Sequence, residues 1–199
     1  MKCEHARGTP LLDTITAFAS ALEARGVVAW GHCENVSRLA ATTARQIGLS
    51  EADIEEIRLA GLVHDLGKLA TPLHVLTKPA PLTPEELAII RDHAVSGPKI
   101  LERLKVPVIS RIVRHHHEHY DGTGYPDHLK GDNIPLGARV VAVAEAFDVM
   151  VGDHPYKSAR KFEEAVAEIR RCSGTQFDPK VVTAFLDWLE IHGDPREQR

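Results

Sequence analysis

The sequence predicts an all-α protein, and three observations support this fold class. Apolar residues recur at three- and four-residue spacing through most of the 199-residue chain, as they do in helices with one buried face. Strict alternation of apolar and polar residues never continues long enough to predict a strand. Glycines, prolines and capping residues divide the periodic stretches into segments of helical length. We expect residues 11–192 to form a single domain between a flexible segment, 1–10, and a frayed tail, 193–199.

Three helices are predicted before a proline-rich loop, at about 10–25, 32–48 and 50–67. The third has Ser50 as its N-cap and Asp53 in its first turn, and we expect it to close at Gly67. Residues 68–82 contain Pro72, Pro79 and Pro81, which exclude a long helix and indicate a loop lying over the domain.

A second group of helices follows this loop. Thr83, Pro84, Glu85 and Glu86 have the composition of a helix start, and they predict a helix that continues through His93. Residues 121–137, rich in Gly, Pro, Asp and Asn, predict a second long loop. The remaining helices are predicted at about 96–104, 107–119, 137–151, 160–172 and 179–191.

Composition excludes several classes of protein. No apolar run approaches the ~20 residues needed to cross a bilayer, and the N-terminal MKCEHARGTP has no apolar signal-peptide core, so we expect a cytoplasmic protein without a membrane partner. The net charge of -4 argues against duplex nucleic acid as a partner. Three cysteines without C-x-x-C spacing support neither a disulfide framework nor a cysteine zinc site. The twelve histidines are more than charge balance requires, and histidine is the commonest metal ligand.

Histidines and carboxylates fall on five separate predicted helices, the pattern by which helix bundles build metal sites. Asp65 has two oxygens and could bridge two ions, whereas its neighbour His64 binds only one. Mixed imidazole and carboxylate ligands favour Fe, Mn, Ni, Zn or Co over Ca or Mg. Three successive histidines sweep 200° of a helix, so we expect His115 to face away from the site. The candidates are His32, His64, Asp65, His93, His115, His116, His117 and Glu145.

Two segments resemble a known family. His64 and Asp65 stand in AGLVHDLGK, downstream of His32, and this pattern is similar to the HD superfamily of metal-dependent phosphohydrolases. Residues 116–126, HHEHYDGTGYP, resemble the HHE-x-x-DG-x-GYP signature of the HD-GYP family. The resemblance extends from about Thr14 to Trp188. It implies an HD-domain helical bundle with a metal site in its core and a Gly-Tyr-Pro loop over it. It also implies hydrolysis of cyclic di-GMP or, as in some members, cyclic GMP-AMP.

The resemblance further implies a role for each matched residue. His32, His64, Asp65 and Glu145 would hold a first metal, and His93, His116 and His117 a second, with Asp65 shared. Lys68 would lie near the scissile phosphate, while Tyr125, Pro126, His154 and Lys157 would contact the substrate. Asp65 and Lys68 are the implied catalytic residues. A metal-bridging hydroxide would open cyclic di-GMP to linear pGpG, and further cleavage would give GMP.

Three residues depart from the family pattern. Glu145 stands where the family has aspartate, and Val28 stands where three-metal members have glutamate. His154 replaces an arginine that contacts phosphate. We therefore predict two divalent transition-metal ions, with Fe or Mn favoured and Ni, Co or Zn as alternatives.

The sequence leaves three hypotheses about the function open. The first is a dinuclear metal phosphodiesterase acting on a cyclic dinucleotide. The second, motivated by Glu145 and His154, is a module that binds cyclic di-GMP, or a protein partner in cyclic di-GMP signalling, without turnover. The third is a phosphohydrolase of the wider HD superfamily acting on a nucleotide monophosphate, which would leave the Gly-Tyr-Pro loop unexplained.

Overall fold

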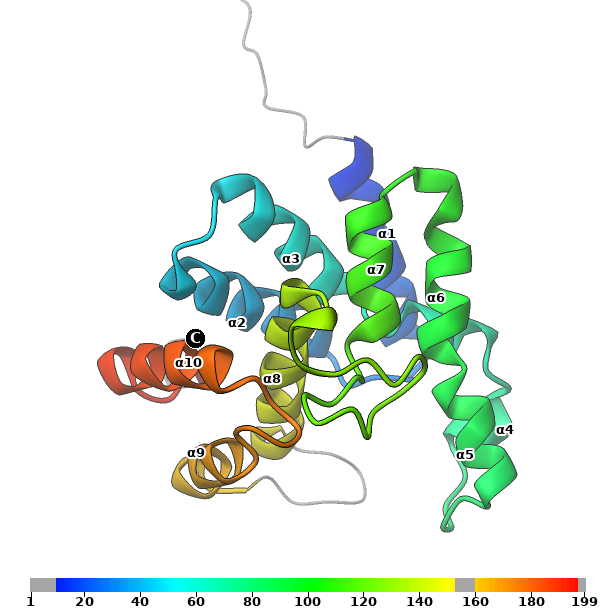
Figure 1. Cartoon of the computed structure of the whole chain (residues 1–199). Helices are drawn as coiled ribbons and strands as arrows, with labels where there is room; N and C mark the ends of the chain where they lie inside the picture. The colour runs from blue at the N-terminus through cyan, green and yellow to red at the C-terminus, as the bar shows by residue number, and fades with distance from the viewer. Residues whose placement is uncertain (1–9, 153–159, 197–199) are drawn as a thin grey trace, which may run out of the picture.

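The computed structural model describes residues 10–152 and 160–196, and the chain within these ranges is helical, as predicted (Figure 1). The one β feature in the described ranges is an isolated bridge between Ser173 and Phe177. The 3₁₀ helices are η1 (Leu66–Ala70), η2 (Glu102–Leu104) and η3 (Gly131–Asn133). The α-helices are α1 (Pro10–Ala24), α2 (His32–Ile47), α3 (Glu51–Val63), α4 (Leu73–Leu76), α5 (Pro84–Arg91), α6 (His93–Leu101), α7 (Pro107–His115), α8 (Leu136–Val151), α9 (Phe162–Arg171) and α10 (Pro179–His192).

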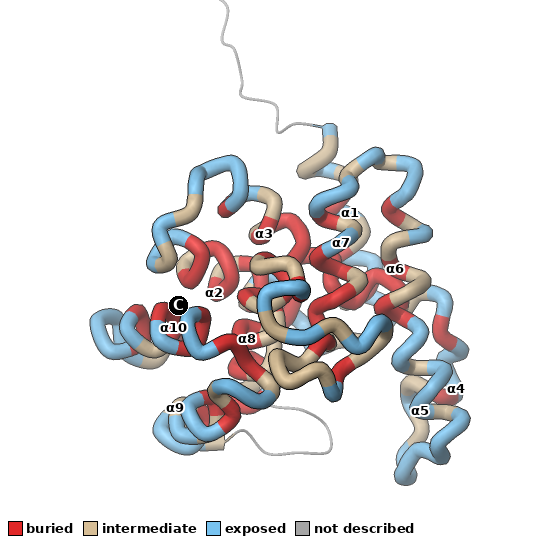
Figure 2. Tube along the Cα trace, viewed as in Figure 1, coloured by how far each residue is buried: buried red, intermediate tan, exposed pale blue. Residues whose placement is uncertain are grey.

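Helix α8 lies at the centre of the bundle and contacts α2, α3, α7, α9 and α10 (Figures 1 and 2). Val140, Val141, Ala144 and Phe147 on this helix are buried. A helix that is apolar on nearly every face is stable only when other helices surround it. Glu145 is therefore placed inside the molecule by the apolar residues on either side of it.

Helices α2 and α3 pack closely against each other and are joined by a short connection. Gly61 makes this approach possible, because a Cβ there would lie 2.8 Å from the Cα of Ser37. The short connection turns the chain back on itself. The start of α2, at His32, is thereby brought beside the end of α3, at His64.

Helix α6 packs on η1 through two glycines. A Cβ on Gly67 would lie 2.0 Å from the carbonyl oxygen of His93, and a Cβ on Gly97 would lie 3.3 Å from the backbone nitrogen of Gly67. The close contact of these two backbones brings the segment after α3 beside the start of α6.

Several predicted helix ends were wrong. The third helix ends at Val63 rather than Gly67, because Asp65 (φ -90, ψ 5) leaves the helical conformation and η1 follows. The helix predicted to continue through His93 ends at Arg91, and α6 begins at His93 instead of residue 96. The helix predicted over 107–119 ends at His115, since the carbonyl of His117 accepts a hydrogen bond from the Tyr125 amide. The loop predicted over 68–82 contains the last residues of η1 and the single turn α4.

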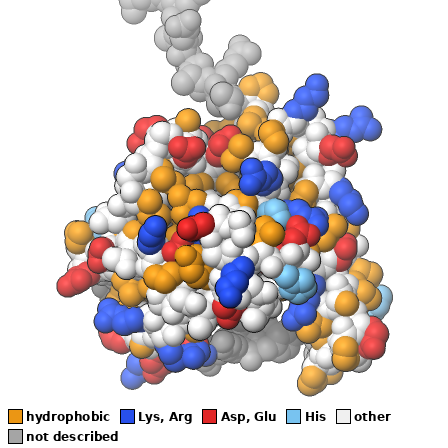
Figure 3. All heavy atoms as spheres, viewed as in Figure 1, with side chains coloured by type: hydrophobic (Ala, Val, Ile, Leu, Met, Phe, Trp, Pro, Cys, Tyr) orange, Lys and Arg blue, Asp and Glu red, His pale blue; other side chains and the backbone are white. Residues whose placement is uncertain are grey.

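No helix in the described part of the chain is long and apolar enough to span a membrane. On the face in view, Lys and Arg side chains are interspersed with Asp and Glu (Figure 3). The predicted substrate contacts His154 and Lys157 lie outside the described residues, as do positions 1–9 and 197–199 at the two expected flexible ends.

Candidate metal centre

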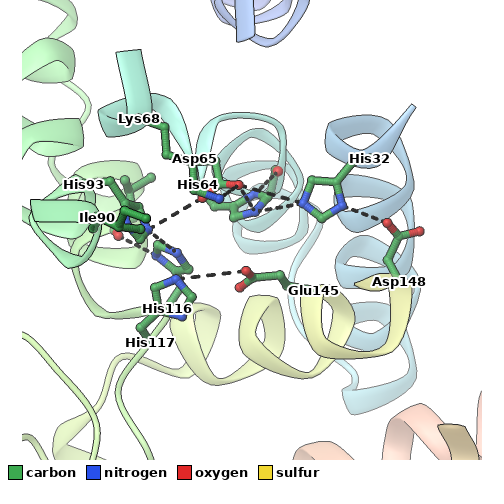
Figure 4. Close-up of polar contacts among 12 residues, drawn as sticks. His32, His64, Asp65, Lys68, Ile90, His93, His116, His117, Glu145 and Asp148 are labelled. Carbon is green, nitrogen blue, oxygen red and sulfur yellow. Dashed lines mark hydrogen bonds and ion pairs between the residues drawn. The ribbon is translucent and has the colours of Figure 1, made fainter. Parts of the chain in front are cut away.

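The predicted ligands converge at one place in the core (Figure 4). Most of them stand at helix ends: His32 opens α2, His64 follows α3, His93 opens α6 and His116 follows α7. His32, His64, Asp65, His93 and His116 are each at most 5% exposed. The inward-pointing helix ends therefore place polar side chains in the core. The buried faces of the helices themselves remain apolar.

Three of the imidazoles are oriented by the same local contact. The Nδ1 atoms of His64, His93 and His116 lie 2.7 to 2.8 Å from the carbonyl oxygens three residues earlier, those of Gly61, Ile90 and Val113. When Nδ1–H donates to a carbonyl, Nε2 keeps its lone pair and serves as the metal-binding atom. The three Nε2 atoms face the centre of the site (Figure 4).

His32 is oriented by a carboxylate instead. Its Nδ1 lies 2.8 Å from Oδ2 of Asp148, which projects from the last turns of α8 (Figure 4). The sequence did not single out this contact of Asp148 with His32. The sequence could have pointed to Asp148, because it lies three residues after the candidate ligand Glu145 in the same segment.

Asp65 lies between the two groups of histidines. Its Oδ2 is 3.5 Å from Nε2 of His64 and 3.9 Å from Nε2 of His32, while its Oδ1 is 3.6 Å from Nε2 of His93. Oδ1 is buried and has no hydrogen-bond partner among the described residues. An unpaired carboxylate oxygen in the core is costly unless a cation satisfies it, so the residues present fit a bound metal.

The side chains form three overlapping donor sets, within each of which the ligand atoms lie within 4.8 Å of one another. The first set, His32, His64 and Asp65, and the second, His93, His116 and His117, correspond to most of the expected ligands of the two metals. Glu145 was expected with the first metal. The structure groups it with Asp65 and His116, and its Oε1 is 4.0 Å from Nε2 of His117.

The protonation states favour cation binding. Burial lowers the pKa of His64 to about 4 and also lowers those of His93, His116 and His117, so these imidazoles are neutral at pH 7. Burial alone would raise the pKa of Asp65, but Lys68 and the neighbouring imidazoles keep it well below its usual value. The site therefore presents neutral nitrogens around an ionised carboxylate.

The pKa values of His32 and Glu145 are raised instead. Burial lowers the pKa of His32, but its hydrogen bond to Asp148 and the charge of Asp65 outweigh this effect and raise it. Burial and the nearby charge of Asp65 raise the pKa of Glu145. A cation between them would reverse both shifts, because it favours neutral His32 and ionised Glu145.

Lys68 borders the centre, and its Nζ lies 2.6 Å from Oδ2 of Asp65. Burial opposes its charge, but Asp65 outweighs this and raises the pKa of Lys68, so its ammonium group stays protonated. A cavity of about 370 Å³ is lined by His32, Asp65, Lys68 and Glu145, with Val28 at its edge. The centre is thus open to a ligand on the side where Lys68 lies.

The Gly-Tyr-Pro loop covers another side of the centre. Tyr125 stacks on His117, with ring centres 4.9 Å apart and ring planes at 27°. Gly124 allows this approach, because a Cβ there would lie 2.2 Å from the His119 nitrogen. The carboxylate of Glu118 accepts hydrogen bonds from the Asp127 and Leu129 amides at 2.7 and 3.1 Å, which holds the loop.

His115 faces away from the centre, as predicted. Its Nε2 lies 2.9 Å from Oδ2 of Asp127, a residue that directly follows the Gly-Tyr-Pro segment. His115 therefore helps to hold the loop rather than a metal. The structure brings together all the predicted ligands, Lys68 and Tyr125, and shows that Asp148 and Glu118 support them.

Comparison with known proteins agrees with this geometry. The HD domain family model matches residues 10–181. A cyclic di-GMP phosphodiesterase of Thermotoga maritima is 42% identical over 179 residues, which cover 88% of this chain and 49% of that protein. A 3'3'-cGAMP-specific phosphodiesterase of Vibrio cholerae is 36% identical over 183 residues, covering 90% of this chain and 35% of the relative. The chain thus spans half or less of the length of these relatives.

A solved structure shows the same fold. The cyclic GMP-AMP-specific phosphodiesterase V-cGAP3 of V. cholerae aligns with a TM-score of 0.71 and 22% identity, over 94% of this chain and 49% of that chain. Residues 116–126 also match the HD-GYP signature. Because the HD domain family model covers most of the chain, the chain belongs to the HD-domain family.

Proposed function

We propose that this chain hydrolyses a phosphodiester bond of a cyclic dinucleotide, with cyclic di-GMP as the leading substrate. The observation that carries the proposal is Asp65, whose two buried oxygens face separate groups of imidazoles. Relatives named for the hydrolysis of cyclic di-GMP and of 3'3'-cGAMP support the substrate class. The proposed product is linear pGpG, with GMP after a second cleavage.

We assign two divalent transition-metal ions to the centre, with Fe or Mn favoured. His32, His64 and Asp65 would hold one, and His93, His116 and His117 the other, with Asp65 shared. Glu145 reaches the space between them, beside Asp65 and His116. Two such ions supply a hydroxide nucleophile at neutral pH and neutralise the charge that builds up on the phosphoryl group.

The chain's own residues supply the rest of the chemistry. Lys68 lines the cavity with a protonated ammonium group, which suits stabilisation of the leaving oxygen. Asp148 keeps Nε2 of His32 pointing into the centre. Tyr125 and Pro126 belong to the loop over the site, where we assign contact with the substrate.

A second candidate function is binding of a cyclic dinucleotide without turnover. The position of Glu145 favours it, since this carboxylate groups with Asp65 and His116 rather than with His32 and His64. A first ion that lacks the fourth protein ligand would be held less tightly. Metal-loaded protein that binds cyclic di-GMP and never cleaves it would support this candidate over hydrolysis.

The test begins with elemental analysis of protein purified without chelator. The protein is then incubated under reducing conditions with Mn(II) or Fe(II) and either cyclic di-GMP or cyclic GMP-AMP, and linear products are quantified. Asp65→Ala should lower turnover by at least ~10²-fold, because the shared carboxylate is lost. Full activity in this variant would rule out the proposed centre.

Asp187→Ala is the matched control. Asp187 is an exposed aspartate on α10. We expect this variant to keep wild-type turnover and metal content. Circular dichroism of both variants should match the wild type, which would show that Asp65→Ala acts on the centre and not on the bundle.

A further inference from the structure

Arg91 ends a stack of three side chains that begins at the candidate metal centre. Its guanidinium carbon lies 5.0 Å from the centre of the Tyr125 ring. Tyr125 in turn stacks on His117, with the ring centres 4.9 Å apart. The three residues come from the end of α5, the Gly-Tyr-Pro loop and the turn after α7. The stack therefore connects a candidate metal ligand to an exposed cation.

Arg91 has no carboxylate partner in the part of the chain that the structure describes. Its one recorded contact there is the Tyr125 ring. Other arginines near the site differ in this respect: Arg114 contacts Asp127 at 2.6 Å, and Arg139 contacts Asp132 at 2.7 Å. The N–H groups of Arg91 are thus available to a ligand, although the group itself is held in place.

The geometry of a stacked guanidinium suits an anion. The group is planar, and when one face packs on an aromatic ring its N–H donors point outward in the plane. Two of these donors match two oxygens of a phosphate. Lys68 is already paired with Asp65 on the metal side. Within residues 10–152 and 160–196, Arg91 is thus a cation that packs on Tyr125 and has no carboxylate partner.

A cyclic dinucleotide contains two phosphate groups, and a metal centre that cleaves one of them leaves the other to be bound. We infer that Arg91 binds this second, non-scissile phosphate, at the outer end of the stack with Tyr125 and His117. The inference rests on the proposed function and deepens it. It makes Arg91 a determinant of specificity for substrates with two phosphates.

The experiment compares two substrates. Cyclic di-GMP has two phosphodiester groups, and bis(p-nitrophenyl) phosphate has one. We expect Arg91→Gln to lower kcat/KM for cyclic di-GMP by about 10- to 100-fold more than for the one-phosphate ester, mainly through KM, because a charge-assisted hydrogen bond is lost. Arg91→Lys should restore part of the KM effect, since it keeps the charge but not the planar fork. Metal content should equal that of the wild type.

Arg45→Gln is the matched control. Arg45 is an exposed arginine in the last turn of α2, as Arg91 is in the last turn of α5. This variant should leave both substrates unaffected. It shows how far the loss of an exposed arginine at a helix end changes kcat/KM when the arginine is not near the site.

Other outcomes overturn the inference. Equal losses on both substrates, or a loss of bound metal, would show that Arg91 only positions Tyr125 and His117. A wild-type KM for cyclic di-GMP in Arg91→Gln would overturn the phosphate role while leaving the proposed hydrolysis intact. Wild-type protein that is loaded with metal and neither binds nor cleaves cyclic dinucleotides would overturn the proposed function, and this inference with it.

Discussion

The orientation of single imidazoles determines what the centre can bind. His64, His93 and His116 each use a backbone carbonyl to fix Nδ1, whereas His32 uses the carboxylate of Asp148. A carboxylate partner makes the imidazole a stronger ligand than a carbonyl does, because the negative charge raises its basicity. Metal binding at His32 should therefore depend on Asp148, which contacts the far side of the imidazole ring.

Asp148→Asn should weaken metal binding at His32 by about 10- to 100-fold. The amide keeps the size of the side chain but removes its charge, so His32 loses basicity and a fixed tautomer. Titration of metal-free protein with Mn(II) measures the affinity. Asp187→Asn, on the exposed face of α10, should behave as wild type. Equal affinities in the two variants would refute a role for Asp148.

The sequence singled out the candidate ligands but not the residues that orient them. His32, His64, Asp65, His93, His116 and His117 were predicted from order and spacing, and the structure brings them together. Asp148 and Arg91 were missed because their roles depend on contacts across the bundle. His32 and Asp148 are 116 positions apart, and no local pattern couples them.

The contact between η1 and α6 determines how the two halves of the centre meet. Gly67 lies directly against the His93 carbonyl, so Asp65 and His93 belong to backbones that touch. Even one methyl group between them would move both ligand-bearing segments. We therefore expect a substitution of Gly67 to disturb the candidate metal centre, although Gly67 contributes no ligand.

Gly67→Ala should destabilise the protein by about 3 kcal/mol, since the new Cβ would meet backbone atoms that cannot move away. It should also weaken metal binding by separating Asp65 from His93. Gly97→Ala is the comparison, because its Cβ meets Val113 at 3.0 Å and should cost nearer ~1 kcal/mol. Urea unfolding measures both. A smaller loss for Gly67→Ala than for Gly97→Ala would contradict the packing argument.

Helix bodies could be predicted better than helix ends. Apolar spacing located α1, α2, α8, α9 and α10 within a few residues. The ends after Val63 and His115 could not be predicted, because tertiary contacts set them. The carbonyl of His117, for example, is taken by the Tyr125 amide from the returning loop. These same ends carry His64 and His116, so local prediction was least accurate at the site itself.

At the scale of the whole molecule, the centre is a group of polar side chains enclosed by an apolar bundle. Its residues come from α2, the segments after α3 and α7, the start of α6, and α8. Buried neutral histidines resist protonation, whereas the unfolded chain protonates them freely. Stability without metal should therefore depend on pH.

Chelator-treated protein should lose stability as the pH falls from 6.5 toward 4. In this window the unfolded state gains protons that folded His64, with its pKa of about 4, does not accept. His64 alone accounts for about 3 kcal/mol. His93, His116 and His117 act in the same direction, while Glu145, whose pKa is raised to about 7, offsets part of the loss. The raised pKa of His32 changes stability only above pH 6.5, outside this window.

Urea midpoints of the chelator-treated protein at pH 7 and pH 5 measure this effect. Metal-loaded protein at pH 7 serves as the reference, and it should unfold at a higher urea concentration than the metal-free protein at the same pH, because the ions bind only the folded chain. A metal-free midpoint that does not change between pH 7 and pH 5 would contradict the proposed neutrality of the buried histidines.

The distance along the chain between His32 and Asp148 has a consequence for how the protein is made. His32, His64 and Asp65 leave the ribosome well before α8 has been synthesised. Until α8 is present, Nδ1 of His32 lacks the carboxylate of Asp148 that it contacts in the folded chain. We therefore expect the orientation of His32 to be completed only when α8 packs on α2.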